Sequence, residues 1–254
     1  MKRVAIVGAA GRMGQVMAEG LGRESDVEVR ALVDIAPPAH SFDAIVATSL
    51  DDLEPSSVDA VVDFSTPEGA LASAAWCATH RVGLVLGTTG LGDTQRAVLA
   101  QAAVSTRVVM AANFALGAVL AERFAVLAAP YFERVEVIEL HHDAKVDAPS
   151  GTSLATARAL AAARRAAGRA DLPEPTLRHS VEGSRGADVE GVRVHAVRLP
   201  GLVAHEEILF GGPGEGLTIR HDSYDRRSFV QGVVLALRKM GDAPGLSEGL
   251  GDFL

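Results

Sequence analysis

The fold is decided near the N-terminus by the stretch Val4-Ala5-Ile6-Val7-Gly8-Ala9-Ala10-Gly11-Arg12-Met13-Gly14. Its four apolar residues predict a buried strand, and its three glycines predict a tight turn that leads straight into a helix. Such a turn lets a phosphate group approach the backbone, while the helix N-terminus supplies N–H donors. The spacing is Gly-x-x-Gly-x-x-Gly, so an ordinary glycine-rich turn is the alternative interpretation of this motif alone.

The first third of the chain continues the alternation of apolar runs and helical stretches, which is typical of a parallel sheet built from βαβ units. The segment Asp34–Leu53 lacks periodicity and predicts loops. The expected strands are Val4–Val7, Val29–Val33, Ala60–Phe64, Gly83–Gly87 and Val108–Ala112, and the expected helices are Met13–Arg23, Glu68–Thr79 and Thr94–Val104.

The pattern changes after Ala115, where strands are grouped together instead of alternating with helices. We therefore predict an α/β protein: a Rossmann-like, doubly wound parallel sheet followed by a second α+β domain with a mixed sheet. The domains are expected at 1–114 and 115–223, with the last helix, within about 224–254, packing back on the first domain. The expected later elements are helices at 116–129, 152–167 and 228–240 and strands at Arg134–His142, Thr176–Val181, Val192–Leu199, Glu206–Phe210 and Leu217–Asp222.

Composition argues against several classes of protein. The 254 residues carry a net charge of −8 at pH 7, which repels nucleic acid and anionic membranes, and no basic patch offsets it. Cys77 is the only cysteine, so an intrachain disulfide and a cysteine-ligated zinc site are excluded and a reducing compartment is expected. With no signal-peptide pattern and no apolar run long enough for a membrane span, we expect a cytoplasmic protein.

A carboxylate after the second strand narrows the interpretation of the glycine turn. Strand Val29–Val33 ends in Asp34, about 20 residues past the turn, where a carboxylate holds the ribose hydroxyls of a dinucleotide. The same charge repels a 2′-phosphate, and the segment from Ile35 to Ala39 offers no arginine to receive one. We therefore predict NADH as the preferred cofactor, while Arg12 leaves NADPH open as a second one.

Two further segments follow strands of the predicted sheet: Gly87-Thr88-Thr89-Gly90 and Ala111-Ala112-Asn113-Phe114. Ligands of open α/β sheets bind at the carboxyl ends of the strands, so both segments are placed to touch the nicotinamide half of the cofactor. A plain turn is the alternative for the first of them.

The densest polar cluster is Glu139-Leu140-His141-His142-Asp143-Ala144-Lys145-Val146-Asp147-Ala148-Pro149-Ser150-Gly151-Thr152. His141 and His142 point to opposite faces of a strand, so one is expected to face the reacting centre and the other to hold a substrate group. Lys145 is the only lysine in mid-chain, and an ammonium beside an imidazole suits protonation of a carbon or nitrogen during a reduction.

The end of this cluster opens a helix, whose first N–H groups form a seat for a carboxylate around Gly151 and Thr152. Ser150 also suits a helix N-cap. The main rival is a metal site built from Glu139, His141, His142, Asp143 and Asp147. It is disfavoured because an ammonium is a poor neighbour for a cation and consecutive strand residues diverge, so no metal is expected.

Other dehydrogenase chemistries fit the sequence poorly. A short-chain dehydrogenase needs Tyr-x-x-x-Lys, but Tyr131 and Tyr224 are followed four residues later by Val135 and Ser228. An acylating aldehyde dehydrogenase needs a nucleophilic cysteine, whereas Cys77 lies on an apolar helix and suits the core.

Taken together, these motifs resemble those of the 4-hydroxy-tetrahydrodipicolinate reductase family, also called dihydrodipicolinate reductases, of the diaminopimelate route to lysine. The resemblance runs in order from the first strand to the last helix, and its most specific part is His-His-x-x-Lys-x-Asp-Ala-Pro-Ser-Gly-Thr. It is carried by the segments Gly8–Gly14, Asp63-Phe64-Ser65-Thr66-Pro67-Glu68-Gly69, Gly87–Gly90, Ala112–Phe114 and Glu139–Thr152.

The resemblance implies a cytoplasmic oxidoreductase that uses NAD(P)H to reduce a cyclic imine dicarboxylate in amino-acid biosynthesis, with loss of a hydroxyl as water. It implies His141 as the acid/base residue, Lys145 as the proton donor and a homotetramer built through the sheet of the second domain. The acidic net charge, for its part, predicts no nucleic-acid or membrane partner. The resemblance further implies that the substrate carboxylates are held by His142, Gly151 and Thr152, and the cofactor by Gly8, Ala9, Ala10, Gly11, Arg12, Met13, Asp34, Gly87, Thr88, Thr89, Ala111, Ala112, Asn113 and Phe114.

Some positions depart from the family pattern. Ile35 stands where many members carry arginine, which supports NADH. The Asn-Phe segment continues without the serine and asparagine often found there, and Ala204-His205-Glu206 replaces a frequent Gly-Glu-His, which leaves His205 and Glu206 without an assigned role. A non-catalytic NADH-binding sensor or an inactive homologue is the competing hypothesis.

Overall fold

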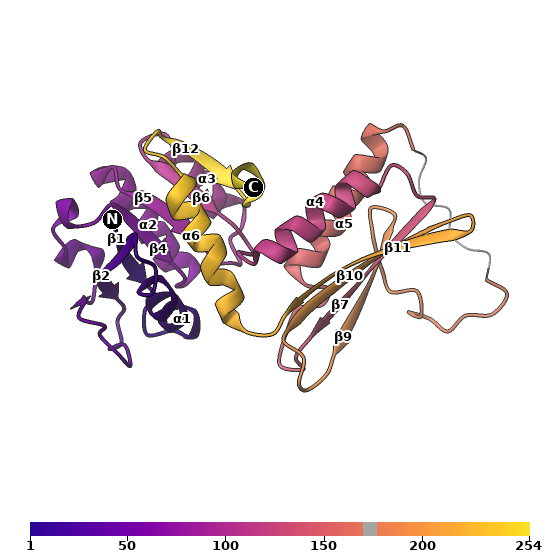
Figure 1. The fold of residues 1–254 in the computed structure, drawn as a ribbon, viewed down its shortest axis with the longest axis horizontal. Coiled ribbons are helices and arrows are strands. Elements are labelled where there is room, and N and C mark those ends of the chain that lie inside the picture. The colour runs from indigo at the N-terminus through magenta and orange to yellow at the C-terminus, as the bar shows by residue number, and fades with distance from the viewer. Residues whose placement is uncertain (170–176) are drawn as a thin grey trace. The chain divides into compact units, whose positions relative to one another are not determined.

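A computed structural model describes residues 1–169 and 177–254. These residues form two compact units, one made of Met1–Leu116 and Arg226–Leu254 and the other of Gly117–Asp225. Figure 1 shows the elements of each unit.

The first unit is built on a seven-stranded sheet in the order β12-β6-β5-β4-β1-β2-β3, and all its strand pairs are parallel. From β3 to β6 this is the 3-2-1-4-5-6 order of the doubly wound dinucleotide-binding fold, so the predicted fold class of this unit is confirmed. The switch in strand order falls between β1 and β4. The strands are β1 (Lys2–Val7), β2 (Val27–Val33), β3 (Ile45–Ala47), β4 (Ala60–Asp63), β5 (Gly83–Leu86), β6 (Arg107–Met110) and β12 (Gly245–Glu248).

Helices cover both faces of this sheet, which is why its central strands are buried throughout. On β4, Val61 packs with residues of α2 and α3 in one apolar cluster, and its neighbour Val62 points to the opposite face because strand side chains alternate. Helix α6 packs on α1, where the side chain of Val230 leaves no room for a Cβ at Gly20. The helices are α1 (Arg12–Leu21), α2 (Pro67–His80), α3 (Asp93–Ala102) and α6 (Val230–Lys239), with 3-10 turns η1 (Leu50–Asp52), η2 (Pro55–Ser57), η3 (Arg226–Phe229) and η4 (Gly251–Phe253).

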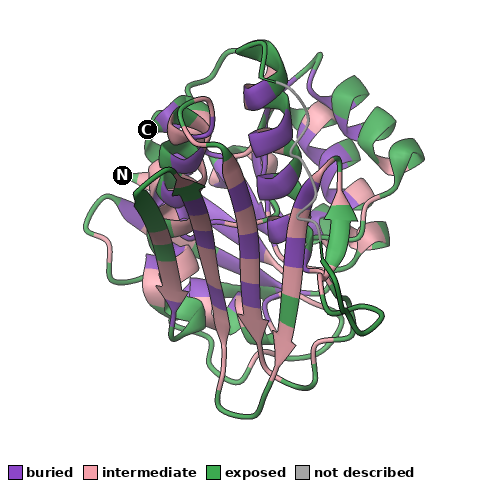
Figure 2. Ribbon diagram, turned by 90° about the vertical axis from the view of Figure 1, so that its right-hand side faces the viewer, coloured by how far each residue is buried: buried purple, intermediate pink, exposed green. Residues whose placement is uncertain are grey.

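The second unit has a five-stranded mixed sheet in the order β11-β10-β7-β9-β8, in which only β7 and β9 are parallel. One face of this sheet packs against α4 and α5 through Val137, Ile208 and Leu160. Figure 2 shows buried and half-buried residues alternating along the strands, as expected when only one face is covered. The elements are α4 (Leu116–Ala128), β7 (Arg134–His141), α5 (Gly151–Ala166), β8 (Ala187–Val189), β9 (Val192–Arg198), β10 (Ala204–Gly212) and β11 (Glu215–Ser223).

One predicted strand is wrong. Of Thr176–Val181, the first residue lies outside the described residues and the other five form no strand. Leu177 and Val181 are 49% and 79% exposed, so the apolar residues that suggested a strand have no core to pack against. Conversely, the structure adds the edge strands β3, β8 and β12 in segments for which no strand was predicted, because pairing with β2, β9 and β6 orders short stretches of weak pattern.

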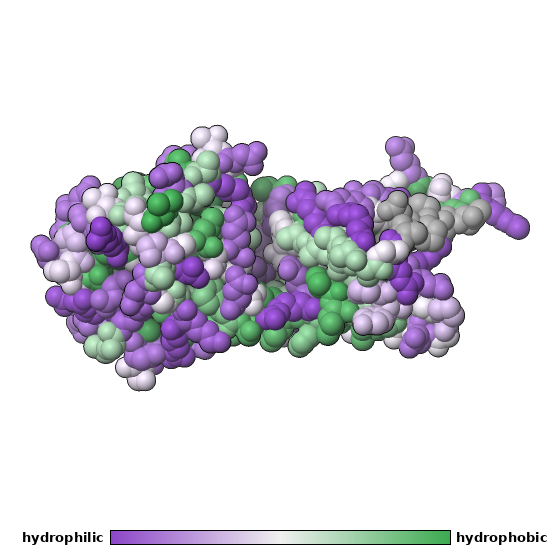
Figure 3. All heavy atoms as spheres, turned by 90° about the horizontal axis from the view of Figure 1, so that it is seen from above, coloured by the Kyte–Doolittle hydropathy of each residue, from purple (hydrophilic) through white to green (hydrophobic). Residues whose placement is uncertain are grey.

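Polar and apolar side chains are mixed over the face that Figure 3 presents. Within the described parts of the chain, no helix is both long enough and apolar enough to cross a membrane.

Candidate functional site

The glycine turn after β1 is tied to the end of β2 and leaves little room for side chains. The amides of Gly8 and Ala9 both donate to the carbonyl of Val33, at 3.0 and 3.3 Å. Gly8 has φ +79°, and a Cβ on it would lie 2.7 Å from the carbonyl oxygen of Phe64. A Cβ on Gly14 would lie 2.1 Å from the carbonyl oxygen of Gly8. The turn is therefore closely packed, and Gly8 and Gly11 present backbone without side chains to the cavity beside it, as phosphate binding requires.

Asp34 lies at the carboxyl end of β2, beside this turn. Its Oδ2 accepts a hydrogen bond from the amide of Ala10 at 2.9 Å, and its Oδ1 accepts one from the amide of Ala36 at 3.1 Å. The two amides fix the direction of the carboxylate, so it is held ready to accept further hydrogen bonds from a ligand's hydroxyl groups.

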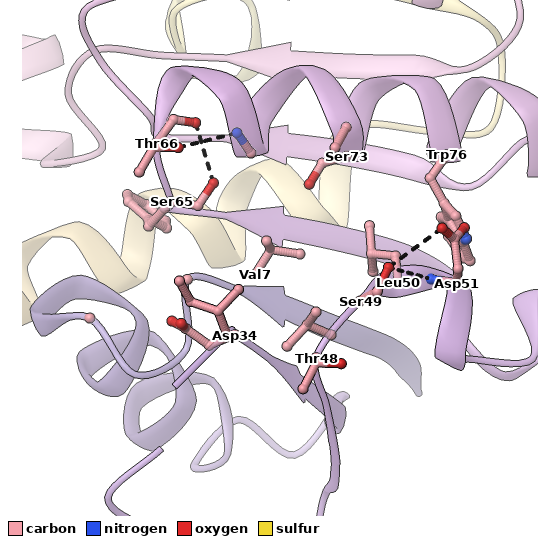
Figure 4. Close-up of a pocket in the computed structure, with 17 residues that line it drawn as sticks. Val7, Asp34, Thr48, Ser49, Leu50, Asp51, Ser65, Thr66, Ser73 and Trp76 are labelled. Atoms are coloured by element: carbon pink, nitrogen blue, oxygen red, sulfur yellow. Dashed lines mark hydrogen bonds between the residues drawn. The ribbon is translucent and has the colours of Figure 1, made fainter. Parts of the chain in front are cut away.

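A cavity of about 510 Å³ opens next to the turn. Figure 4 shows Asp34 and Thr48 on one side of it and Ser65, Thr66 and Ser73, in or just before α2, on the other. Its charged lining side chains are Asp34 and Asp51, and none of the seventeen lining residues is a lysine or an arginine. The lining is Val7, Gly8, Gly11, Val33, Asp34, Ile35, Thr48, Ser49, Leu50, Asp51, Phe64, Ser65, Thr66, Gly69, Ala72, Ser73 and Trp76.

The buried carboxylate of Asp63, at the end of β4, joins three segments near this cavity. Its oxygens accept hydrogen bonds from the hydroxyls of Ser65 and Thr88 at 2.8 Å each and of Ser73 at 2.6 Å. Its carbonyl accepts one from the amide of Gly87 at 2.8 Å. The Gly87–Thr89 segment is therefore anchored to the β4–α2 connection.

The structure brings only part of the predicted cofactor residues to the cavity. Gly8, Gly11 and Asp34 line it, whereas Ala9, Ala10, Arg12 and Met13 belong to the turn and the start of α1 without lining it. The segments Gly87–Thr89 and Ala111–Phe114 lie beyond it, at the carboxyl ends of β5 and β6. There Phe114 is buried with its ring edge against Phe64, 5.8 Å between centroids.

In the second unit, Glu139 is fully buried near the end of β7, on the same strand face as His141. Its Oε2 lies 2.5 Å from Nδ1 of His141 and 2.7 Å from a guanidinium nitrogen of Arg198. Its Oε1 accepts hydrogen bonds from the other terminal nitrogen of Arg198 at 2.7 Å and from the amide of Ser150 at 3.1 Å. One carboxylate therefore holds an imidazole, a guanidinium and the N-cap residue of α5.

The protonation states of this pair follow from its surroundings. Burial raises the pKa of Glu139, but hydrogen bonds from Arg198 and His141 outweigh it, so the carboxyl pKa lies below its ordinary value. Burial lowers the pKa of His141, the hydrogen bond to Glu139 opposes this, and the positive charges of Lys145 and Arg198 lower it further. At neutral pH the carboxylate is thus ionised and the imidazole is neutral.

Lys145 lies in the loop between β7 and α5. Its ammonium donates to Oδ1 of Asp147 at 2.7 Å, and its side chain is only 21% exposed. That hydrogen bond is the main reason that the pKa of Asp147 lies below its ordinary value. His142 is half-buried in the same loop, and its carbonyl accepts the amide hydrogen of Lys145 at 3.2 Å.

Helix α5 begins at a well-formed cap. The hydroxyl of Ser150 accepts a hydrogen bond from the amide of Ser153 at 3.2 Å. Gly151 is exposed, with no other group within 4 Å of the position of a Cβ, so a ligand can reach the backbone there. The half-buried Thr152 follows in the first turn of this 16-residue helix, whose N-terminus favours an anion.

The two residues without an assigned role have polar partners in this unit. Nδ1 of His205 lies 2.7 Å from Oδ1 of Asp222, and Oε1 of Glu206 accepts the hydroxyl hydrogen of Thr156 at 2.9 Å. Burial raises the pKa of Glu206. Among the described residues, no group of three or more His, Cys, Asp or Glu side chains is placed to hold a metal ion.

The sequence alone did not indicate that Glu139 contacts His141, and it did not single out Arg198. The i, i+2 spacing of Glu139 and His141 on a strand is a signal that the two share a face. Arg198 is distant in sequence and reaches Glu139 only because β9 pairs with β7, for which the sequence carries no local signal. The same holds for Asp51 in the cavity of the first unit.

The chain is similar to known proteins over its whole length. Family models described as the N-terminus and the C-terminus of dihydrodipicolinate reductase match residues 2–114 and 107–254. The chain is 45% identical over 258 residues to the 4-hydroxy-tetrahydrodipicolinate reductase of Corynebacterium urealyticum, covering 100% of this chain and 99% of that one. It is 46% identical over 256 residues to that of Nocardia farcinica, covering 99% and 98%.

The fold is also similar to that of solved structures. A dipicolinate-bound dihydrodipicolinate reductase from Paenisporosarcina sp. TG-14 is 38% identical, with a TM-score of 0.88 and full coverage of both chains. GenD2 from gentamicin A biosynthesis, solved in complex with NAD, shares the fold at 19% identity, with a TM-score of 0.65 and coverage of 99% of this chain and 90% of that one.

Proposed function

Because the chain belongs to the dihydrodipicolinate reductase family, we propose that it reduces (2S,4S)-4-hydroxy-2,3,4,5-tetrahydrodipicolinate to (S)-2,3,4,5-tetrahydrodipicolinate in the cytoplasm, in the diaminopimelate route to lysine. The ring gains one hydride and one proton and loses its 4-hydroxyl as water. The observation that supports this most directly is the cluster around Glu139: a neutral imidazole, a nearby ammonium and a helix N-terminus in one segment of the second unit.

The residues of the first unit fit a dinucleotide. Bare backbone at Gly8 and Gly11 borders the cavity, and the carboxylate of Asp34 is fixed beside it. When bound, the reduced nicotinamide supplies the hydride. Gly8–Met13 and Asp34 hold the phosphate and adenosine end, and Gly87–Thr89 and Ala111–Phe114 border the nicotinamide.

The family uses NAD(P)H, and we assign NADH as the preferred form for this chain. The cavity beside the glycine turn holds two carboxylates, Asp34 and Asp51, and no basic side chain lines it. A 2′-phosphate there would meet negative charge with no guanidinium to pair with. Ile35, 93% exposed, stands directly after Asp34 where an arginine would be needed. Because Arg12 is exposed at the start of α1, slower use of NADPH is compatible with this assignment.

The substrate and product are dicarboxylates, so an anion-binding site at the N-terminus of α5 is needed even in a protein with a negative net charge. His142 and the first turn of α5, at Gly151 and Thr152, hold the carboxylates. Loss of the 4-hydroxyl as water leaves a ring C=C conjugated with the C=N. Hydride addition at C4 of this system then leaves an electron-rich enamine, and the ammonium of Lys145 donates the proton that its carbon takes up. His141 is neutral at the working pH and serves as the acid/base residue next to the ring.

We also assign a homotetramer, formed through the sheet of the second unit. The face of this sheet opposite α4 and α5 carries Ile138, Leu140 and Leu209, which remain only half-buried in the single chain. The same face also carries charged side chains of both signs, among them Glu136 and Arg220, so apolar and ion-pair contacts are both available for a self-complementary contact with other copies.

The test is a coupled assay in which the imine is formed enzymatically from pyruvate and aspartate semialdehyde and the absorbance of NADH is followed. Oxidation of NADH that requires both the imine and this chain supports the proposal. NADH binding by calorimetry without any oxidation points instead to a non-catalytic NADH sensor or an inactive homologue.

A further inference from the structure

Each of the two carboxylate oxygens of Glu139 has two hydrogen-bond partners on the surrounding elements. Both terminal nitrogens of Arg198 pair with it in the fork geometry, at 2.7 Å each, and it also holds His141 and the amide of Ser150. A fully buried carboxylate with a bidentate arginine is fixed in one rotamer. Glu139 does not depend on a ligand for its position.

This arrangement decides which nitrogen of His141 carries the proton. An ionised carboxylate can only accept hydrogen bonds, so Nδ1 of the neighbouring imidazole must be the donor. In the neutral ring, the lone pair is then on Nε2. We propose that Glu139 is a positioning residue that holds His141 in this single tautomer and ring orientation, with Arg198 as its counter-charge. The inference rests on the proposed function, in which His141 is the acid/base residue.

Arg198 extends the same network to the proton donor. One of its terminal nitrogens also donates to the carbonyl of Asp147 at 2.7 Å, and the carboxylate of Asp147 accepts from the ammonium of Lys145. A continuous chain of contacts therefore links His141, Glu139, Arg198, Asp147 and Lys145. Since Glu139 also binds the amide of Ser150, it joins the acid/base residue, the proton donor and the start of the anion seat.

Replacing Glu139 by glutamine keeps the size of the side chain but removes its charge and one of its two hydrogen bonds from Arg198. The glutamine oxygen can still accept from Ser150, and the side chain is nearly identical in volume. Its amide nitrogen, however, is a donor, so it pairs with an unprotonated Nδ1 and moves the proton of His141 to Nε2. It also removes the negative charge that stabilises protonated His141.

The charged groups around His141 are Glu139 on its own strand, Arg198 on β9 and Lys145 in the following loop, with Glu206 of β10 paired opposite Glu139. Only Glu139 raises the pKa of His141, while Lys145 and Arg198 lower it. Glu139→Gln is therefore expected to lower the pKa of His141 further and to move the acidic limb of the kcat profile to lower pH.

The kinetic test is a double-mutant cycle. Glu139→Gln is expected to lower kcat by about 10²-fold or more, as loss of a carboxylate behind a catalytic imidazole does. In a His141→Ala background its loss of kcat is expected to be at least about tenfold smaller than in the wild type, because the part of its effect that passes through His141 is then absent. Equal losses in the two backgrounds would show a structural role only and overturn the inference.

Glu136 provides a matched control, because it also pairs with an arginine and a histidine, Arg185 and His195, on the opposite face of the same strand. Glu136→Gln disrupts an equivalent Glu–Arg–His network without touching His141, and because Glu136 lies on the sheet face assigned to the tetramer contact, light scattering checks that the assembly of this variant is unchanged. We expect its pH profile to match that of the wild type. A shift of the acidic limb equal to that of Glu139→Gln would contradict a specific effect through His141.

The tautomer of His141 can also be measured directly in the wild-type protein, without relying on enzyme activity. Nitrogen NMR of labelled histidine, with the His141 signal assigned from its absence in His141→Ala, reports which ring nitrogen is protonated. A proton on Nδ1 in the wild type is expected, and a proton on Nε2 would overturn the inference even if the enzyme is fully active. Conversely, normal turnover of His141→Ala with the proton on Nδ1 would refute the proposed role of His141 and leave the tautomer assignment standing.

Discussion

The proton-transfer residues contribute as single side chains, and their removal should have large effects without loss of the fold. Lys145→Ala and His141→Ala are each expected to lower kcat by roughly 10²–10⁴-fold, as loss of an acid or base does. Steady-state kinetics and circular dichroism measure this. Val146→Ala, a change at the fully exposed neighbour, is the control and should behave as wild type. Near-normal turnover in both site variants would contradict proton transfer by Lys145 and His141.

The shifted pKa of His141 predicts the acidic limb of the pH profile. Because burial lowers this pKa below its ordinary value of 6.5, the neutral ring predominates at pH 7, and kcat/KM should fall only at pH values below 6.5. The same shift affects the free energy of unfolding. As the pH falls below 6.5, His141 of the unfolded chain takes up a proton more readily than His141 of the native state, so acid lowers the stability of the fold through this residue. A pH–rate profile checks the first point, and an acidic limb centred above pH 6.5 contradicts it.

Asp34 should decide between the two nicotinamide nucleotides. We expect a higher kcat/KM with NADH than with NADPH, and a weaker preference in Asp34→Ala, because the carboxylate that repels a 2′-phosphate is removed. Glu28→Gln, on the same strand but outside the cavity, is the control. Preference of the wild type for NADPH by about tenfold, or 1.4 kcal/mol, would contradict the assignment.

At the scale of elements, Asp63 connects β4, α2 and the segment after β5. Asp63→Ala leaves three hydroxyls and the amide of Ser65 without their acceptor in a buried site. We expect the free energy of unfolding to fall by about 2–4 kcal/mol, since each buried unpaired polar group costs about 1–3 kcal/mol and hydroxyls can reorient in part. Urea denaturation measures the loss, and calorimetry should show weaker NADH binding.

Asp59, just before β4, supplies the comparison for this variant. It pairs with Arg3 near the surface, with both side chains more than a third exposed, so Asp59→Ala should cost less than about 1 kcal/mol. An equal loss of unfolding free energy in the two variants would mean that the buried hydrogen bonds of Asp63 stabilise the fold no more than the surface ion pair of Asp59 does.

At the scale of the whole molecule, the assembly is the property to test. Light scattering should give four times the chain mass of 26.4 kDa. Ile138→Asp places a charge on the uncovered sheet face and is expected to yield smaller species. Leu127→Asp is the control, because Leu127 is 70% exposed on α4, away from that face. A tetramer that survives Ile138→Asp would exclude this face as the contact.

Much of this protein is determined by its sequence alone, because the deciding signals are local. A strand, a glycine turn and a helix in succession fix a βαβ unit, and repetition of that unit fixes a parallel sheet, so the sequence predicts the fold class that is observed. The segment from Glu139 to Thr152 also gathers its chemistry within one loop, so the residue types and their spacing are enough to single out His141 and Lys145.

Tertiary structure decided what depends on distant pairings. The strand expected at Thr176–Val181 has β character but no partner, and β3 and β12 have weak patterns but find partners at the sheet edges. The contact of Arg198 with Glu139 arises from the pairing of β9 with β7 and cannot be read from either segment. Local sequence sets backbone preferences and the kinds of side chain available. Which carboxylate meets which cation, and hence which nitrogen of His141 holds its proton, depends on chain segments that meet only in the folded state.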